Sequence, residues 1–96
     1  MINIAEILFK QVCTITNNIS EYRKKGYSII YDFENQLLSI NYNNSTYIAK
    51  IILNDGSLYW QLEPYNNSLF TTKYESEESF NLVLFAIKEN DELYKN

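Results

Sequence analysis

The chain has 96 residues, a formal net charge of −4 and 46% apolar residues, which predicts one folded domain over residues 1–96. It contains no histidine, so catalytic triads that use histidine are excluded and the commonest metal ligand is missing. Its single cysteine, Cys13, excludes a disulfide within the chain. We therefore expect no cofactor, no metal site and no enzyme activity.

The N-terminal segment has neither a basic leader nor a small-residue cleavage site, and the longest apolar run, residues 82–87, is far too short to span a bilayer. We expect a soluble, cytoplasmic protein that binds no membrane. The best basic cluster is Arg23, Lys24 and Lys25, at the expected end of a helix, where the helix dipole favours positive charge. Because three such residues are thin support for binding phosphates, no direct nucleic-acid binding is expected.

Residues 2 to about 24 are predicted to form one helix. Gly26 follows, in the position where a glycine commonly ends a helix. The helix could pair with a partner helix as a coiled coil, but about three heptads are short for that, so packing on a sheet is favoured. Cys13 is interpreted as a small apolar packing residue. The apolar residues that recur at spacings of three and four are Ala5, Leu8, Val12, Ile15, Ile19 and Tyr22.

The clearest strand signal covers residues 46–64, where two β-rich runs are joined by Asp55 and Gly56. An Asp-Gly pair favours the tight two-residue turn of a β-hairpin. In the second run Leu58, Trp60 and Leu62 alternate with polar residues, which predicts one buried and one exposed face. In the first run two alternating sets compete for the outer face, and the pattern does not choose between them: Tyr47, Ala49, Ile51 and Leu53, or Thr46, Ile48, Lys50 and Ile52.

Further strands are predicted at residues 27–33, 36–42 and 68–74, with Asn-rich turns between them. A last helix is predicted over residues 77–94, with Ser76 as its N-cap. Because strands joined by tight turns are usually neighbours, the fold class is α+β. We predict an antiparallel, four- to five-stranded β-meander with an N-terminal and a C-terminal helix packed on it.

Two surfaces are candidates for binding a protein partner. The last helix is apolar around most of its circumference, so Leu82 and Phe85 are a possible self-interface. The chain also has nine tyrosines, a residue type that interfaces favour, although tyrosines can equally line a sheet as strand formers. The predicted partner-binding residues come from the outer side of the second hairpin strand, from its continuation and from the acidic segment after the strands. They are Tyr59, Gln61, Glu63, Tyr65, Glu75, Glu77 and Glu78.

An acidic chain with displayed tyrosines suits a basic partner, because complementary charge speeds encounter and orients the complex. Richness in Asn, Ile, Tyr and Lys is typical of AT-rich genes and indicates a bacterial mobile element or a phage. The chain is similar in size and charge to anti-CRISPR and toxin-immunity proteins, although no motif identifies either family. We predict a stoichiometric inhibitor of a basic, nucleic-acid-acting protein. The alternatives are a homodimeric structural or adaptor protein, and a small-molecule binder or enzyme that uses the concave side of the sheet and a carboxylate.

Overall fold

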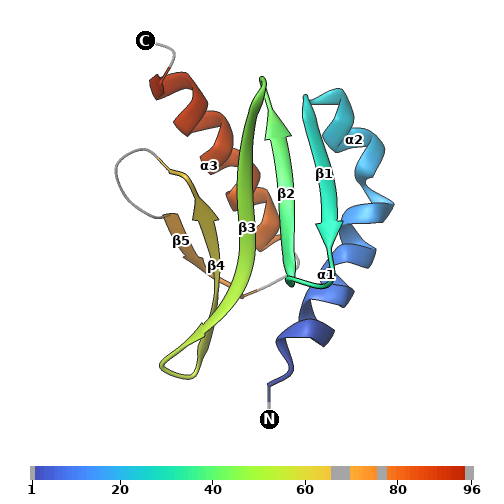
Figure 1. Ribbon diagram of the computed structural model, residues 1–96, viewed down its shortest axis with the longest axis vertical. Coiled ribbons are helices and arrows are strands. Elements are labelled where there is room, and N and C mark those ends of the chain that lie inside the picture. Colours follow the sequence, from blue (N-terminus) through green and yellow to red (C-terminus); the bar gives the residue numbers. More distant parts are fainter. Residues whose placement is uncertain (1, 66–69, 76–77, 95–96) are drawn as a thin grey trace.

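The computed structural model describes residues 2–65, 70–75 and 78–94. A five-stranded antiparallel sheet has its strands in chain order, with the N-terminal helices before it and a C-terminal helix after it in the sequence (Figure 1). This confirms the predicted α+β meander. The elements are α1 (Ile4–Asn17), α2 (Ile19–Lys24), β1 (Tyr27–Asp32), β2 (Leu37–Tyr42), β3 (Ser45–Asn54), β4 (Ser57–Glu63), β5 (Phe70–Lys73) and α3 (Ser79–Tyr94).

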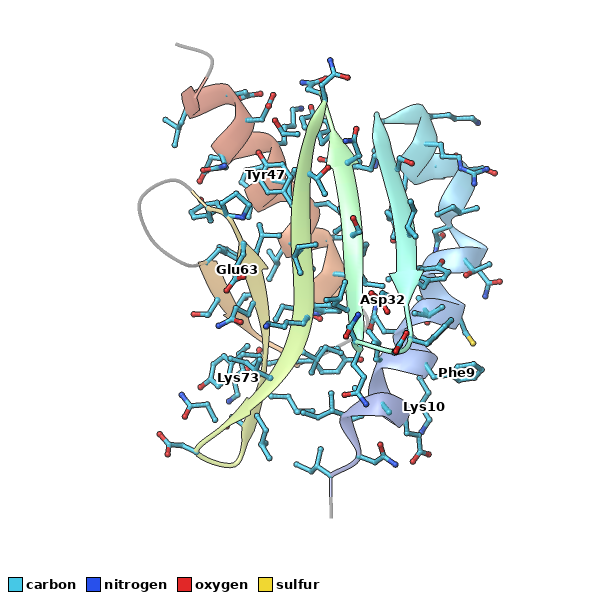
Figure 2. The ribbon with its side chains drawn as sticks, viewed as in Figure 1. Phe9, Lys10, Asp32, Tyr47, Glu63 and Lys73 are labelled. Atoms are coloured by element: carbon cyan, nitrogen blue, oxygen red, sulfur yellow. The ribbon has the colours of Figure 1, made fainter. Side chains whose placement is uncertain are left out.

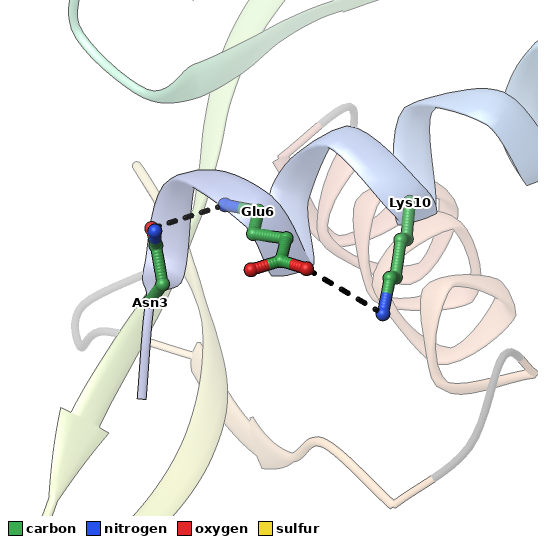
Figure 3. A network of polar contacts seen from close by, with 3 residues as sticks. All are labelled: Asn3, Glu6 and Lys10. Atoms are coloured by element: carbon green, nitrogen blue, oxygen red, sulfur yellow. Dashed lines mark hydrogen bonds and ion pairs between the residues drawn. The ribbon is translucent and has the colours of Figure 1, made fainter. Parts of the chain in front are cut away.

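The first helix begins two residues later than predicted because Asn3 caps it. The side-chain Oδ1 of Asn3 accepts a hydrogen bond from the backbone N–H of Glu6 at 3.2 Å, which satisfies one donor of the first turn (Figure 3). The Glu6 carboxylate also lies 3.9 Å from Lys10 Nζ, one turn further along. Both partners are exposed, so this ion pair adds little stability.

The prediction of one unbroken helix up to residue 24 is wrong, because the chain leaves helical geometry at Asn18 and resumes it in α2. The Asn18 side chain donates a hydrogen bond to the carbonyl of Thr14 at 2.9 Å. Asparagine side chains compete in this way with the backbone bonds of a helix, which is why they favour helix ends. Gly26 follows α2 with φ of +97°, as predicted for a glycine that ends a helix.

The interpretation of Cys13 as a packing residue is also wrong, since its side chain is exposed. Val12 is buried against the sheet, and successive residues of a helix point about 100° apart. The residue after Val12 is therefore turned away from the core.

Two tight turns have the geometry that their sequences predict. Asn43 and Asn44 join β2 to β3 with φ values of 50° and 67°, and Asp55 and Gly56 join β3 to β4 with 50° and 78°. Positive φ at both turn residues matches the twist of the adjoining strands. These turns set the register of three consecutive strands, in which Ala49 pairs with Leu38 on one side and Leu62 on the other.

All three helices lie on the same face of the sheet, and the core fills the space between them. Leu58, Trp60 and Leu62 point to this side, as predicted, and β3 contributes the set that contains Tyr47, Ala49 and Ile51. The fully buried sheet residues meet apolar side chains of α1 and α3 there. The core consists of Leu8, Val12, Ile15, Tyr27, Leu38, Ile40, Tyr47, Ala49, Ile51, Trp60, Leu62, Phe80, Val83, Leu84, Ala86 and Ile87.

Polar contacts inside the core tie the sheet to the helices. Trp60 Nε1 donates to Ser79 Oγ at 3.0 Å, and the Tyr27 hydroxyl donates to the carbonyl of Leu84 at 2.9 Å. On α1, the buried Gln11 accepts a hydrogen bond from the Tyr74 hydroxyl at 2.9 Å. Because each bond has one fixed partner, these contacts specify how the helices sit on the sheet.

Candidate functional site

The face of the sheet opposite the helices is uncovered by any element of the described chain (Figure 1). We call it the open face. Its residues are those that alternate with the core residues along each strand. They are Ser28, Ile30, Asp32, Leu37, Ser39, Asn41, Thr46, Ile48, Lys50, Ile52, Tyr59, Gln61, Glu63, Thr71 and Lys73.

A band of apolar side chains crosses the open face diagonally. Ile52 of β3 pairs directly with Tyr59 of β4, and Ile30 of β1 lies in one row with Ser39, Ile48 and Glu63. Diagonal neighbours in adjacent strands are close enough for long side chains to touch. Ile30 is the most exposed member, at 65% of its free surface. This apolar band consists of Ile30, Leu37, Ile48, Ile52 and Tyr59.

Four charged residues lie beside the band or within it, and their formal charges cancel: Lys50, between Ile48 and Ile52, and Lys73 against Asp32 and Glu63. Figure 2 marks Glu63 on β4 and Lys73 on the neighbouring β5. Hydrogen bonds from the side chain and then from the backbone N–H of Asn35 lower the pKa of Asp32, which keeps this carboxylate ionised. The net charge of −4 therefore comes from the rest of the molecule.

The predicted site residues on β4, Tyr59, Gln61 and Glu63, all lie on the open face. Tyr65 does not join them. Its hydroxyl donates to Glu89 Oε1 of α3 at 2.9 Å, and its ring packs 5.3 Å from that of Phe70. Burial, and next the bond to Glu89, raise the pKa of Tyr65. The strand ends at Glu63, so the alternation that would carry Tyr65 outward stops before it.

The predicted acidic residues lie at the junction of β5 and α3. Glu75 and Glu78 line an open hollow of about 310 Å³ together with Leu82, while Glu77 lies outside the described residues. Lys73, which also belongs to the open face, sits 3.6 Å from Glu75. This acidic segment thus borders one end of the open face rather than forming part of it.

The predicted self-interface residues are both exposed on the side of α3 that faces away from the sheet. Leu82 is 52% exposed and Phe85 is 64% exposed. Phe85 also borders a hollow of about 240 Å³ between α2 and α3, where Tyr22 and Lys25 form the other wall. Leu82 and Phe85 belong to a different surface from the open face, but Leu82 shares a hollow with Glu75 and Glu78, so the predicted self-interface adjoins the acidic part of the predicted partner-binding set.

Sequence reasoning missed most of the apolar band. Both alternating sets of β3 are largely apolar, so periodicity alone left open whether Ile48 and Ile52 point in or out. Phe33, the last residue of the strand predicted over residues 27–33, instead lies in the turn after β1 and is 56% exposed, with its ring 6.5 Å from that of Phe9. The sequence signal that could have decided the orientation of β3 is Lys50, because a lysine favours an exposed position and this one lies in the same alternating set as Ile48 and Ile52.

Comparisons with protein-family models, with curated proteins and with solved structures find no match for this chain. Within residues 2–65, 70–75 and 78–94, no helix is long and apolar enough to cross a membrane. The same residues contain no cluster of three metal-ligating side chains.

Proposed function

We propose that this protein is a stoichiometric binding protein that docks on a protein partner through the open face and blocks it. One observation carries the proposal: a sheet face that no described element covers presents an apolar band with charged residues beside and within it. Contiguous apolar surface with a polar rim is typical of protein interfaces. Tyr59 supplies the large, rigid side chain that often dominates the binding energy of such surfaces.

The proposed partner is basic, and a protein that acts on nucleic acid is the natural candidate because it must carry positive surface. The open face is itself neutral, so the complementary charge would come from Glu75 and Glu78 at its border. Charges at a rim act mainly on the rate and orientation of encounter. An inhibitor from a phage or mobile element, of the anti-defence or immunity type, combines these properties without catalysis or a cofactor.

The test compares two double variants that each truncate one aliphatic and one aromatic side chain. Ile52→Ser with Tyr59→Ala removes the centre of the apolar band, whereas Leu82→Ser with Phe85→Ser removes the exposed residues of α3. Tagged proteins capture partners from a low-GC bacterial host lysate, and native mass spectrometry weighs the eluted complexes. We expect one basic protein at fixed stoichiometry, lost more than tenfold in the first variant and retained in the second.

A charge-reversal variant, Glu75→Lys with Glu78→Lys, separates steering from docking. It should slow association several-fold, with a smaller effect on dissociation, in surface plasmon resonance at low salt. If the open-face variant captures the same partner as the unchanged protein, docking through this face is refuted.

A homodimeric structural or adaptor protein is the second candidate, and the exposure of Leu82 and Phe85 favours it. Two copies of α3 packed through these residues would form a symmetric interface. Sedimentation velocity at high micromolar concentration would then show a dimer that Leu82→Ser with Phe85→Ser dissociates. A mass that this variant leaves unchanged counts against the α3 interface.

A further inference from the structure

We propose that the outer edge of β1 pairs with the same edge of a second copy of this chain. The two strands would run antiparallel, centred on Ile29, and join two sheets into one continuous sheet. This inference does not depend on what docks on the open face. It rests on the backbone of β1, on its side chains and on the charges at its two ends.

The edge of β1 is unpaired in the described chain. β1 hydrogen-bonds to β2 on one side, and no described strand lies on the other (Figure 1). Such an edge is a template for another strand, and proteins that stay monomeric usually protect it with a charge, a proline, a bulge or a very short strand. β1 has six residues, Tyr-Ser-Ile-Ile-Tyr-Asp, with neither proline nor lysine, and pairs with β2 without a bulge.

The opposite edge of the sheet shows the protection that β1 lacks. β5 has four residues and carries Lys73. Short length and a lysine are two recognised ways of blocking edge-to-edge pairing. The sheet therefore has one edge with these two protections and one edge without them, which limits pairing through edges to two copies.

The backbone groups at the free edge belong to Tyr27, Ile29 and Tyr31. The tight turn after β2 makes Tyr42 and Ile40 direct their backbone N–H and C=O toward β3. On the other side of β2, these two residues lie opposite Tyr27 and Ile29 of β1. Because hydrogen-bonding groups alternate along a strand, Tyr27 and Ile29 direct their N–H and C=O away from β2. Pairing centred on Ile29 places Tyr27 opposite Tyr31 of the second copy and allows about six inter-chain hydrogen bonds.

The charges at the two ends of β1 select the antiparallel arrangement. Arg23, Lys24 and Lys25 precede the strand, Asp32 is its last residue and Glu34 follows it. Figure 1 shows α2 beside the start of β1, and Figure 2 shows Asp32 at the other end of the strand. An antiparallel second copy brings the basic end of each strand to the acidic end of the other, twice by symmetry. Glu21, 3.7 Å from Lys24, reduces the basic charge without cancelling it.

The same register joins the two open faces. Ser28 of one copy lies opposite Ile30 of the other, at a pair without hydrogen bonds, where the side chains come closest. Ile30, the most exposed residue of the apolar band, is thereby covered. The basic segment, which the proposed function does not use, and Ile30, at the end of the apolar band, both take part in this contact.

The first test is self-association of the full chain, measured by sedimentation velocity at low salt. Arg23→Glu and Glu34→Arg each place like charges at both ends of the interface, while the double variant restores opposite charges. We expect each single variant to weaken the dimer about fivefold, and the double variant to recover most of the loss. Raising the salt concentration should remove the differences. The proposal is overturned if the chain is monomeric at high micromolar concentration. It is also overturned if the dimer of the double variant is weakened by as much as the effects of the two single variants combined.

The second test addresses register, in a Cys13→Ser background that removes the exposed native thiol. Ser28→Cys and Ile30→Cys proteins are mixed with oxidised glutathione and the products weighed by mass spectrometry. In the proposed register, position 28 of one copy and position 30 of the other have Cα atoms about 4.5 Å apart, which is within disulfide range. The same position in the two copies, 28 with 28 or 30 with 30, lies about 7–8 Å apart. We expect cross-linked dimers in the mixture and few in either protein alone. Cross-linking of the Ile30→Cys protein alone would refute the register.

These tests are distinguishable from those of the proposed function. Arg23 and Glu34 lie outside the apolar band, so a failure of charge rescue leaves docking on the open face untouched. Conversely, Ile52→Ser with Tyr59→Ala should not alter sedimentation. Loss of the dimer in Leu82→Ser with Phe85→Ser would assign self-association to α3 and refute the β1 edge.

Discussion

The two faces of the sheet are built from the same strands but have opposite relations to the rest of the chain. On the helix-covered face Trp60 is fully buried and hydrogen-bonded to Ser79, whereas its neighbour Tyr59 lies half-buried on the open face. Adjacent residues of one strand thus serve different ends. The covered face holds the hydrophobic core, and we propose that the open face binds a partner, so substitutions on the two faces should separate stability from binding.

The largest expected difference is between Trp60→Ala and Tyr59→Ala. The first leaves a large cavity among Phe80, Tyr74 and neighbouring core residues and should cost about 3–5 kcal/mol of unfolding free energy. The second removes a half-buried ring from the open face and should cost about 1 kcal/mol. Urea unfolding followed by circular dichroism measures both. Equal losses would show that the open face is part of the folded core.

A smaller contrast separates two serines. Ser79→Ala removes the acceptor of the Trp60 indole N–H and leaves a buried donor unpaired, which should cost about 1–3 kcal/mol. Ser39→Ala, at the middle of β2 on the open face, is the matched control and should change stability by less than about 0.5 kcal/mol. Replacing Trp60 by Phe in the Ser79→Ala background removes the unpaired donor. If Trp60 Nε1 bonds to Ser79 Oγ, the losses of unfolding free energy of the two single variants should therefore not add up in the double variant.

The smallest contrast at neutral pH concerns Tyr27, whose hydroxyl bonds to Leu84. Tyr27→Phe should cost about 1 kcal/mol. Burial, and next the neighbouring Tyr42, raise the pKa of Tyr27 to about 12, from 10.0 in the unfolded chain. Below pH 10 the Tyr27 hydroxyl keeps its proton in both the folded and the unfolded protein, so its full contribution to the free energy of unfolding is present. Between pH 10 and 12 the unfolded protein releases this proton while the folded protein keeps it, so the free energy of unfolding falls.

Urea titrations from pH 8 to pH 12 test this dependence. Tyr27→Phe should flatten the alkaline fall. Tyr65→Phe, at a more exposed hydroxyl whose pKa is also raised, should flatten it less. An alkaline fall that Tyr27→Phe leaves unchanged would contradict the assignment to this buried hydroxyl.

Much of the fold could be predicted because its signals are local. Asp55 and Gly56 adopt the left-handed geometry that a two-residue turn requires, and Gly26 ends α2 for a related reason. The inward set of β4 was readable because polar residues alternate with Leu58, Trp60 and Leu62. Such patterns depend on the residue and its immediate neighbours, and tertiary contacts did not override them.

Only part of the candidate site followed from the same reasoning. Gln61 and Glu63 share the open face as their strand period requires, but Ile48 and Ile52 were left undecided because both sets of β3 are apolar. Tyr65 was placed with them by extending the alternation, which ends one residue before Pro64. Its bond to Glu89 of α3 joins residues 24 positions apart, a contact that no local pattern contains.

The sequence by itself thus determined the elements, their order and the tight turns, because periodicity and turn chemistry act over a few residues. The tertiary structure alone decided which face of the sheet remains open. Both terminal helices carry apolar stripes, but a stripe does not predict which face of the sheet its helix covers. Once α1 and α3 share the side of Trp60, the other set of every strand faces outward, and the apolar band becomes surface.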